Sequence, residues 1–569
     1  MNHQPLLSAV TVTAAVLLPA LFSGAVAAAT VSGTVTTGDA VPLASVMVTL
    51  RDERGLAESV FTDAAGHFRL DTALAGKLAL RVRKRYYDDV LQDLTLAADD
   101  VRDLALELAP LTDPKALSDA APSLSHFSRI AFDADETAPF SRGNFARDCL
   151  SCHSLGNSFT RWPRPAASWV PTVQRMHGYF GNADMAFVER RAELLAAAFD
   201  GTPLDHYPAQ PDEPALAGTR IYQFPLPGTV VPHDAEFDHV NGHIYSSEMF
   251  AGEILETNLE TGTTRHFKLP ADGLPPGGAF TQNGLPVPYG LTTPRAPHSL
   301  AQGPDGRWYL TDSIGAALTV FDPKTEAFES HPLGAGALYP HTVRVAPGGV
   351  VWFTIAFTDQ VGRFDPQTKD MKVITLPKTA SLSAPAGAVP YGIDVNPKDG
   401  SVWYAKLASD KIGRIDPETL AVTEIDSPVR APRRQRFDRA GYLWIAGFSD
   451  GSIARFDPAS GDATIYKLPV IAPGEIPAPY ALAIDPVNQD VWVNDTMLDV
   501  AWRFIPAEER FITYPMPLRG TYTRDFTFTD KGWVCTSNNP IPAAALEGGM
   551  PESICIDTGD RASTALAGK

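Results

Sequence analysis

A unit of about 40 residues recurs from residue 219 to the end of the chain, and this repeat restricts the fold more than any other feature. Two successive copies read "APHSLAQGPDGRWYLTDSIGAALTVFDPKTEAFESHPL" (296–333) and "YPHTVRVAPGGVVWFTIAFTDQVGRFDPQTKDMKVITLP" (339–377). Each copy holds four short apolar runs, which predict the four strands of a β-propeller blade. The inner hairpin of a blade needs residues at positive φ, and glycines stand at that point in four copies: Gly242, Gly306, Gly349 and Gly400.

Counting the copies predicts seven blades, of which the last is one strand short. The segment "RIYQFPLP" (220–227) is similar to the outer strands of other copies, such as "TIYKLP" and "KVITLP", yet it precedes the first copy. We therefore expect residues 219–569 to form a seven-bladed β-propeller in which 220–227 complete blade seven. Such a closure removes the free edge of the sheet.

The register of the blades predicts which side chains meet at one rim of the central channel. The start of each inner strand supplies the first set: His233, His298, His341, Tyr391, Arg433, Tyr480 and Arg524. The end of each second strand supplies the second set: Glu248, Asp312, Ile355, Lys406, Gly447, Asp495 and Asn538. Imidazoles beside carboxylates can hold a divalent metal or transfer protons, so five residues are candidate catalytic groups: His233, Glu248, His298, Asp312 and His341.

Two cations on the opposite side of this rim, Lys406 and Arg433, suit an anionic group of a substrate. The alternative is a wet channel lined by polar residues of the repeat that have no joint function.

The phrases "KIGRIDPET" and "QVGRFDPQT" resemble the virginiamycin B lyase (streptogramin lyase) family of seven-bladed propellers over residues 219–569. The resemblance implies an elimination that opens an ester ring, carried out by channel histidines and glutamates with a divalent metal. His233 with Glu248 and His298 with Asp312 match the family's pattern. Three positions where the family repeats glutamate depart from it: Ile355, Lys406 and Gly447.

Residues 30–110 alternate apolar and polar side chains between glycines, which predicts a small antiparallel β-sandwich. The phrase "GTVTTGDAVPLASVMVTLRDERG" and the run "VFTDAAGHFRL" resemble the carboxypeptidase regulatory-like (transthyretin-like) module. We expect a spacer or adhesion module here and identify no site in it.

Residues 111–218 show helical periodicity and contain "RDCLSCHSLG" (147–156). The spacing Cys149-x-x-Cys152-His153 is that of c-type haem attachment, with two thioether bonds and His153 on the iron. A redox dithiol or a chance match is the alternative. We therefore expect a small α-helical, cytochrome c-like domain with covalent haem c.

The second axial ligand of the iron is predicted from a resemblance. The segment "SWVPTVQRMHGYF" resembles the W-x-x-x-V-x-R-M helix of small cytochromes with a methionine ligand, which implies Met176 on the iron. His177, Met185 and His126 stay open as alternatives.

Residues 1–29 contain an apolar run closed by small residues, which predicts a cleaved signal peptide and a periplasmic or secreted protein. No later stretch is long and apolar enough to span a membrane. In an oxidising compartment, Cys535 and Cys555 are expected to form a disulfide. The net charge of −19 argues against nucleic acid and anionic membranes, and it suits a cationic partner such as a basic cytochrome.

The favoured function is a periplasmic oxidoreductase or electron-transfer protein, in which the propeller binds or oxidises a small molecule and the haem passes electrons on. A metal-dependent lyase with an accessory cytochrome is the second hypothesis. A non-enzymatic binding protein is the third.

Overall fold

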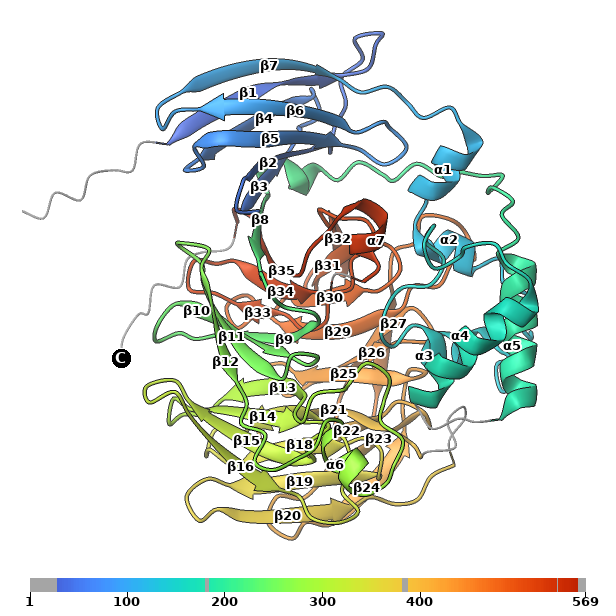
Figure 1. Cartoon of the computed structure of the whole chain (residues 1–569), viewed down its shortest axis with the longest axis vertical. Coiled ribbons are helices and arrows are strands. Elements are labelled where there is room, and N and C mark those ends of the chain that lie inside the picture. The colour runs from blue at the N-terminus through green and yellow to red at the C-terminus, as the bar shows by residue number, and fades with distance from the viewer. Residues whose placement is uncertain (1–27, 180–183, 381–386, 540, 561–569) are drawn as a thin grey trace, which may run out of the picture.

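The computed structural model describes residues 28–179, 184–380, 387–539 and 541–560. Most of the predicted signal peptide (residues 1–27) lies outside the described residues. The described chain is mainly β, with an N-terminal β domain, a helical segment and a propeller-like C-terminal region (Figure 1).

The C-terminal region contains six four-stranded antiparallel sheets, each built from consecutive strands. The first three sheets are β9 (Pro232–Phe237), β10 (His243–Glu248), β11 (Glu253–Asn258) and β12 (Thr264–Lys268); β13 (Pro297–Gln302), β14 (Trp308–Asp312), β15 (Ala317–Asp322) and β16 (Ala327–Pro332); and β17 (Pro340–Val345), β18 (Val351–Ile355), β19 (Gln360–Asp365) and β20 (Asp370–Thr375). The next three are β21 (Pro390–Val395), β22 (Val402–Lys406), β23 (Lys411–Ile415) and β24 (Val422–Asp426); β25 (Pro432–Phe437), β26 (Leu443–Gly447), β27 (Ser452–Phe456) and β28 (Ala463–Lys467); and β29 (Pro479–Ile484), β30 (Val491–Asp495), β31 (Val500–Ile505) and β32 (Arg510–Pro515).

The inner strand of each sheet contacts the inner strand of the next, so these strands surround a central channel. The four glycines expected at inner hairpins, Gly242, Gly306, Gly349 and Gly400, all have φ between 73° and 86°. Tryptophans at or near the start of the second strands fill the space between sheets: Trp308, Trp352, Trp403, Trp444 and Trp492 are buried.

The seventh sheet of the ring is assembled from both ends of the propeller-like region. It contains β33 (Thr527–Phe528), β34 (Val534–Asn538) and β35 (Glu552–Asp557), and β8 (Arg220–Pro225) is its fourth strand. β8 runs antiparallel to β35, with Tyr222 opposite Cys555. The ring therefore closes through a strand that precedes the first sheet in sequence.

The N-terminal β domain shares this seventh sheet. Its strands are β1 (Ala29–Thr36), β2 (Met47–Asp52), β3 (Ala57–Phe61), β4 (His67–Thr72), β5 (Gly76–Arg83), β6 (Val90–Leu96) and β7 (Val101–Glu107). Three of them form the sheet β4-β1-β7, and the other four continue blade seven in the order β35-β8-β3-β2-β5-β6. Every second residue of β1 is buried, as the alternation in the sequence predicts. The sequence did not predict that β3 would pair with β8.

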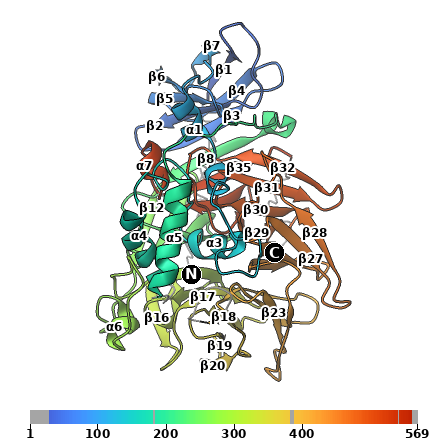
Figure 2. The same cartoon turned by 90° about the vertical axis from the view of Figure 1, so that its right-hand side faces the viewer.

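The helical segment between the two β regions contains α1 (Pro114–Ala120), α2 (Ser123–Phe127), α3 (Arg142–Cys149), α4 (Ala166–Tyr179), α5 (Met185–Ala198) and the 3-10 turn η1 (Pro214–Gly218). Two further short helices, α6 (Gly278–Gln282) and α7 (Ala543–Glu547), lie in loops of the propeller-like region. Side chains of α2, α3, α4 and α5 join one apolar cluster with propeller residues such as Phe448, Met497 and Tyr522. The helical segment is thus packed onto the propeller by a common core (Figure 2).

None of the helices in the described residues is long and apolar enough to cross a bilayer.

Candidate functional site

The Cys-x-x-Cys-His cluster lies at the end of α3. This helix begins at the N-cap Ser141, whose side chain accepts a hydrogen bond from the Asn144 amide, and it ends at Cys149. Cys149 and Cys152 are free, partly buried thiols. Burial raises the pKa of Cys149 to about 11, so its thiol is protonated at neutral pH.

A cavity of about 510 Å³ opens beside this cluster, and most of its lining atoms are carbon. Cys149 and His153 line it from the α3 side, and α4 and α5 supply the facing wall with Trp169, Val173 and Leu195. The volume is that of a typical small-molecule or cofactor site. Cys152 is not among the lining residues. Burial raises the pKa of its thiol, and the propeller residues Arg524 and Arg433 oppose this shift.

The cavity brings together one thioether and two imidazoles, those of Met176, His153 and His177. Nδ1 of His153 lies 2.9 Å from the Ser154 carbonyl oxygen and donates to it, so Nε2 stays available as a ligand atom. Nε2 of His177 is already used, because Nη1 of Arg191 donates to it over 2.9 Å.

The other two candidates for the second axial position lie away from the cavity lining. His126 is buried elsewhere, with Nε2 2.8 Å from the Ser118 carbonyl oxygen. Met185 is 38% exposed at the start of α5. The structure therefore brings Met176, but neither His126 nor Met185, to the wall of the cavity.

Three buried donors of the lining have no hydrogen-bond partner among the described residues: the indole N–H of Trp169, Nε–H of Arg164 and Nε–H of Arg191. The Arg164 guanidinium stacks 3.8 Å above the Trp169 ring. An unpaired buried donor costs about 1–3 kcal/mol, so this part of the cavity suits a ligand with an anionic or carbonyl oxygen.

A second cluster lies in the propeller channel, where the first residues of the inner strands form a ring. The imidazole ring centroids of His233 and His298 are 3.8 Å apart, those of His298 and His341 are 3.8 Å apart, and Tyr391 follows His341 at 3.9 Å. Arg433 continues the series between the rings of Tyr391 and Tyr480, and Arg524 lies over Tyr480 at 5.9 Å. We call these seven residues the channel ring: His233, His298, His341, Tyr391, Arg433, Tyr480 and Arg524.

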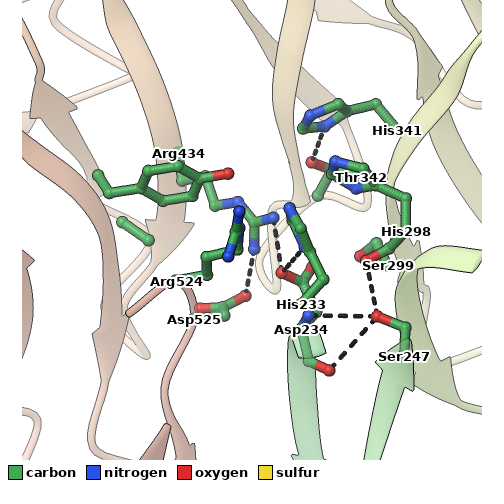
Figure 3. Close-up of polar contacts among 12 residues, drawn as sticks. His233, Asp234, Ser247, His298, Ser299, His341, Thr342, Arg434, Arg524 and Asp525 are labelled. Atoms are coloured by element: carbon green, nitrogen blue, oxygen red, sulfur yellow. Dashed lines mark hydrogen bonds and ion pairs between the residues drawn. The ribbon is translucent and has the colours of Figure 1, made fainter. Parts of the chain in front are cut away.

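The residues that follow three ring members form an ionic layer beneath it (Figure 3). Asp234 accepts from Nη2 of Arg434 at 2.8 Å, and Nη1 of Arg434 donates to Asp525 at 2.9 Å. Asp234 also accepts from Nδ1 of His233 at 2.9 Å. Burial, with the Arg524 guanidinium adding to it, lowers the pKa of His233 to about 3, so this imidazole is neutral.

The two carboxylates predicted for the rim do not join the histidines. Glu248 accepts hydrogen bonds from the backbone amides of Val231 and Ala251. Asp312 accepts from the amides of Ala296 and Gly315 and pairs with Arg295 at 2.9 Å. These carboxylates hold loops beside the strand ends. Within the described residues, no group of three or more His, Cys, Asp or Glu is placed to hold a metal ion.

Lys406 is also turned away from the channel ring. Its ammonium group pairs with Glu424 at 2.7 Å and donates to the Pro377 carbonyl at 2.6 Å. Arg433 lies in the ring, but it does not face Lys406. The structure thus does not bring these two predicted anion-binding residues together.

The loop that carries the Cys-x-x-Cys-His cluster covers the channel ring. The Tyr522 hydroxyl donates to the Leu150 carbonyl at 2.6 Å, Arg433 donates to the Ser151 carbonyl at 3.2 Å, and the Asn539 amide donates to the Cys152 carbonyl at 3.4 Å. The three ring histidines are each at most 3% exposed. The mouth predicted to admit a substrate is therefore closed on this side.

Several functional contacts were missed by the sequence analysis. Asp234, Arg434 and Asp525 each follow a ring member by one position, so the same register argument could have found them. No sequence signal pointed to Tyr522 or Asn539, because their role depends on where the helical segment packs.

The predicted disulfide is present. Cys535 on β34 lies directly opposite Cys555 on β35, and the two are bonded.

Comparisons with known proteins bear on the two β regions. Residues 277–493 match the Virginiamycin B lyase family. Residues 30–109 match the carboxypeptidase regulatory-like domain. The helical segment lies outside both matches, and no curated protein matches the chain.

Similar solved structures include virginiamycin B lyase from Staphylococcus aureus, in its selenomethionine form, with 17% identity and a TM-score of 0.48. This comparison covers 59% of the present chain and 99% of the lyase. A structure titled streptogramin B lyase has 17% identity and a TM-score of 0.48, with coverage of 60% and 97%. The structure of U3-55K has 9% identity and a TM-score of 0.46, with coverage of 59% and 98%.

Proposed function

We propose that the protein is an exported, haem c-containing electron-transfer protein or oxidoreductase, with the haem held by the helical segment. The observation that carries this proposal is the cavity of about 510 Å³ beside Cys149 and His153, with Met176 on its wall. A Cys-x-x-Cys-His sequence without such a cavity would support a redox dithiol equally well.

The residues around the cavity fit a haem in three respects. Carbon atoms dominate the lining, as a porphyrin face requires. His153 keeps Nε2 available because Nδ1–H is held by the Ser154 carbonyl. The unpaired donors of Trp169 and Arg164 suit the propionate carboxylates of the group.

In this proposal Cys149, His153 and Met176 would hold the haem from the cavity wall, the first through a thioether bond and the other two through the iron. Cys152, which lies outside the lining, would turn its thiol toward the cavity to form the second thioether bond. When bound, the haem supplies a one-electron couple to the protein. The chain's own residues surround the cavity with apolar side chains, orient the His153 imidazole and place the Arg433 guanidinium beside the loop that carries the Cys-x-x-Cys-His cluster. The acidic surface, with a net charge of −19, suits a basic redox partner.

The lyase hypothesis is favoured by the family match over residues 277–493. The arrangement of the channel argues against it. Glu248 and Asp312 accept hydrogen bonds from backbone amides. The loop that carries the Cys-x-x-Cys-His cluster covers the channel ring, so a bulky cyclic ester has no access from that side.

The proposal is tested by producing the full chain in cells with a haem c attachment system and staining a denaturing gel for haem. We expect a stained band at the size of the protein. The double variant Cys149→Ala, Cys152→Ala should give an unstained band of equal protein amount, because both covalent bonds to the haem are lost.

The matched control is Cys535→Ala, Cys555→Ala, which removes the same number of cysteines from the propeller. It should keep the stain. An unstained band from the unmodified chain would refute the haem assignment and leave the binding-protein hypothesis standing.

A further inference from the structure

The buried part of the propeller channel contains more positively charged side chains than negatively charged ones. Five guanidiniums lie on or beside the inner strands, those of Arg344, Arg433, Arg434, Arg436 and Arg524. Arg433, Arg434 and Arg524 are at most 4% exposed. A buried charge without a counter-charge costs several kcal/mol.

The carboxylates of Asp525 and Asp234 pair with three of these arginines, and Oδ2 of Asp234 is buried without a hydrogen-bond partner among the described residues. Asp525 accepts from Arg344 at 3.0 Å, Arg434 at 2.9 Å and Arg436 at 2.5 Å. Asp234 pairs with Arg434 at 2.8 Å. The ring members Arg433 and Arg524 form no ion pair with a carboxylate anywhere in the part of the chain that the structure describes.

Two more acids on the inner strands do not restore the balance. Burial raises the pKa of Glu236 to about 8 and that of Asp394 to about 7. On or beside the inner strands there are then five guanidiniums against four carboxylates, those of Asp234, Glu236, Asp394 and Asp525. Even when Glu236 and Asp394 are counted as ionised, one guanidinium remains in excess.

Unused donors accompany this excess charge. Nε and Nη1 of Arg524 are buried and have no hydrogen-bond partner among the described residues, and the same holds for Nε of Arg433. Arg433 and Arg524 both approach the Tyr480 ring, at 3.8 and 5.9 Å from its centroid. Figure 3 shows Arg524 beside Arg434 and His233 on the wall of the channel.

We propose that the channel ring binds a small inorganic oxyanion between the guanidiniums of Arg433 and Arg524. Guanidinium groups donate charge-assisted hydrogen bonds to such an ion, and the donors left free are Nε and Nη1 of Arg524 and Nε of Arg433. The covering loop at Leu150–Cys152 closes the site, so the anion is a resident component of the channel.

The test measures anions released when the purified full-length protein is denatured, by ion chromatography. We expect about one equivalent of oxyanion for each chain. Arg524→Gln should reduce this amount about tenfold or more, because a charge-assisted hydrogen bond contributes about 1.5–3 kcal/mol. Arg455→Gln is the control: Arg455 lies in the same blade as Arg433 but stacks on Tyr442, outside the channel.

A second measurement covers the case in which Arg524→Gln does not fold. Arg524→Lys retains the charge but loses the Nε and Nη1 donors of the guanidinium, so inorganic phosphate should raise its melting temperature less than that of the unmodified protein. No released anion from the unmodified protein, together with no effect of phosphate on its melting temperature, would overturn the proposal.

A competing counter-charge is the phenolate of Tyr480. Burial raises the pKa of Tyr480, but Arg433, Arg524 and Arg434 outweigh burial and hold it below its ordinary value. A tyrosinate absorption band at neutral pH that Tyr480→Phe abolishes, in protein that releases no anion, would assign the counter-charge to Tyr480 and refute the anion site. Neither result bears on haem attachment, since haem staining is independent of the channel ring.

Discussion

Met176 and His177 are neighbours on α4 and both line the cavity, but they differ in which ligand atom is available. Nε2 of His177 already accepts from Arg191, whereas Met176 offers a thioether. We expect Met176→Ala to keep the covalent haem and to lower the reduction potential, because methionine ligation raises it. His177→Ala should leave the potential nearly unchanged. Spectroelectrochemical titration of both variants measures this, and the reverse pattern would assign the ligand to His177.

Two buried histidines make the helical segment sensitive to acid. Burial lowers the pKa of both His126 and His177 to about 4, with Arg161 adding to the effect at His126 and Arg191 at His177. Between pH 4 and the unfolded value of about 6.5, the unfolded chain binds more protons than the folded chain. The free energy of unfolding should therefore fall as the pH drops through this window.

Denaturant titrations at pH 7 and pH 5 measure this loss of stability. His126→Gln removes one of the two groups, and its amide N–H can still donate to the Ser118 carbonyl. The variant should lose less stability between the two pH values than the unmodified protein. An identical loss in both proteins would show that His126 does not titrate in this way.

At the scale of elements, β8 is the strand that connects the two β regions in one sheet. It pairs with β35 on one side and β3 on the other, so it joins the propeller to the N-terminal domain. Deleting residues 220–225 should lower the melting temperature of the propeller sharply and release the N-terminal domain to limited proteolysis. A soluble deletion variant with unchanged melting behaviour would contradict this role.

The disulfide acts on the same sheet, since it links β34 to β35 next to β8. Cys535→Ala, Cys555→Ala removes a cross-link between residues 20 apart in sequence. We expect a loss of about 3 kcal/mol in unfolding free energy, because the unfolded chain gains loop entropy. Denaturant titration under non-reducing conditions measures it, and the same variant treated with reductant should show no further loss.

At the scale of the whole molecule, the helical segment is held on the propeller by a few polar anchors around the common apolar core. Arg142 is 8% exposed and donates to the Ser449 carbonyl at 3.1 Å and to the Ile476 carbonyl, and Ser449 donates to the Gly143 carbonyl at 2.9 Å. Arg142→Ala leaves buried carbonyl groups unpaired, at a cost of about 1–3 kcal/mol.

We expect this variant to expose residues 111–218 to protease while the propeller keeps its melting temperature. Arg129→Ala is the control, because Arg129 donates to Thr202 within the helical segment itself. Equal protease sensitivity of the two variants would show that Arg142 does not anchor the segment.

The features that the sequence alone determined are those set by local periodicity. The 40-residue repeat predicted the blades, the glycines at positive φ and the residues of the channel ring, because each follows from the position of a residue within its own unit. The same comparison of units predicted that residues 220–227 complete blade seven. The disulfide between Cys535 and Cys555 was expected on a different ground, the oxidising compartment that the predicted signal peptide implies.

The tertiary structure decided which of these side chains act together. Glu248 and Asp312 occupy the predicted strand ends, but their carboxylates accept hydrogen bonds from nearby loop amides and do not join the ring histidines. The pairing of β3 with β8 depends on contacts between segments far apart in sequence, and so does the position of the loop at Leu150–Cys152 over Tyr522 and Arg433. Such contacts are selected by the shape and charge of folded surfaces, which no local pattern encodes.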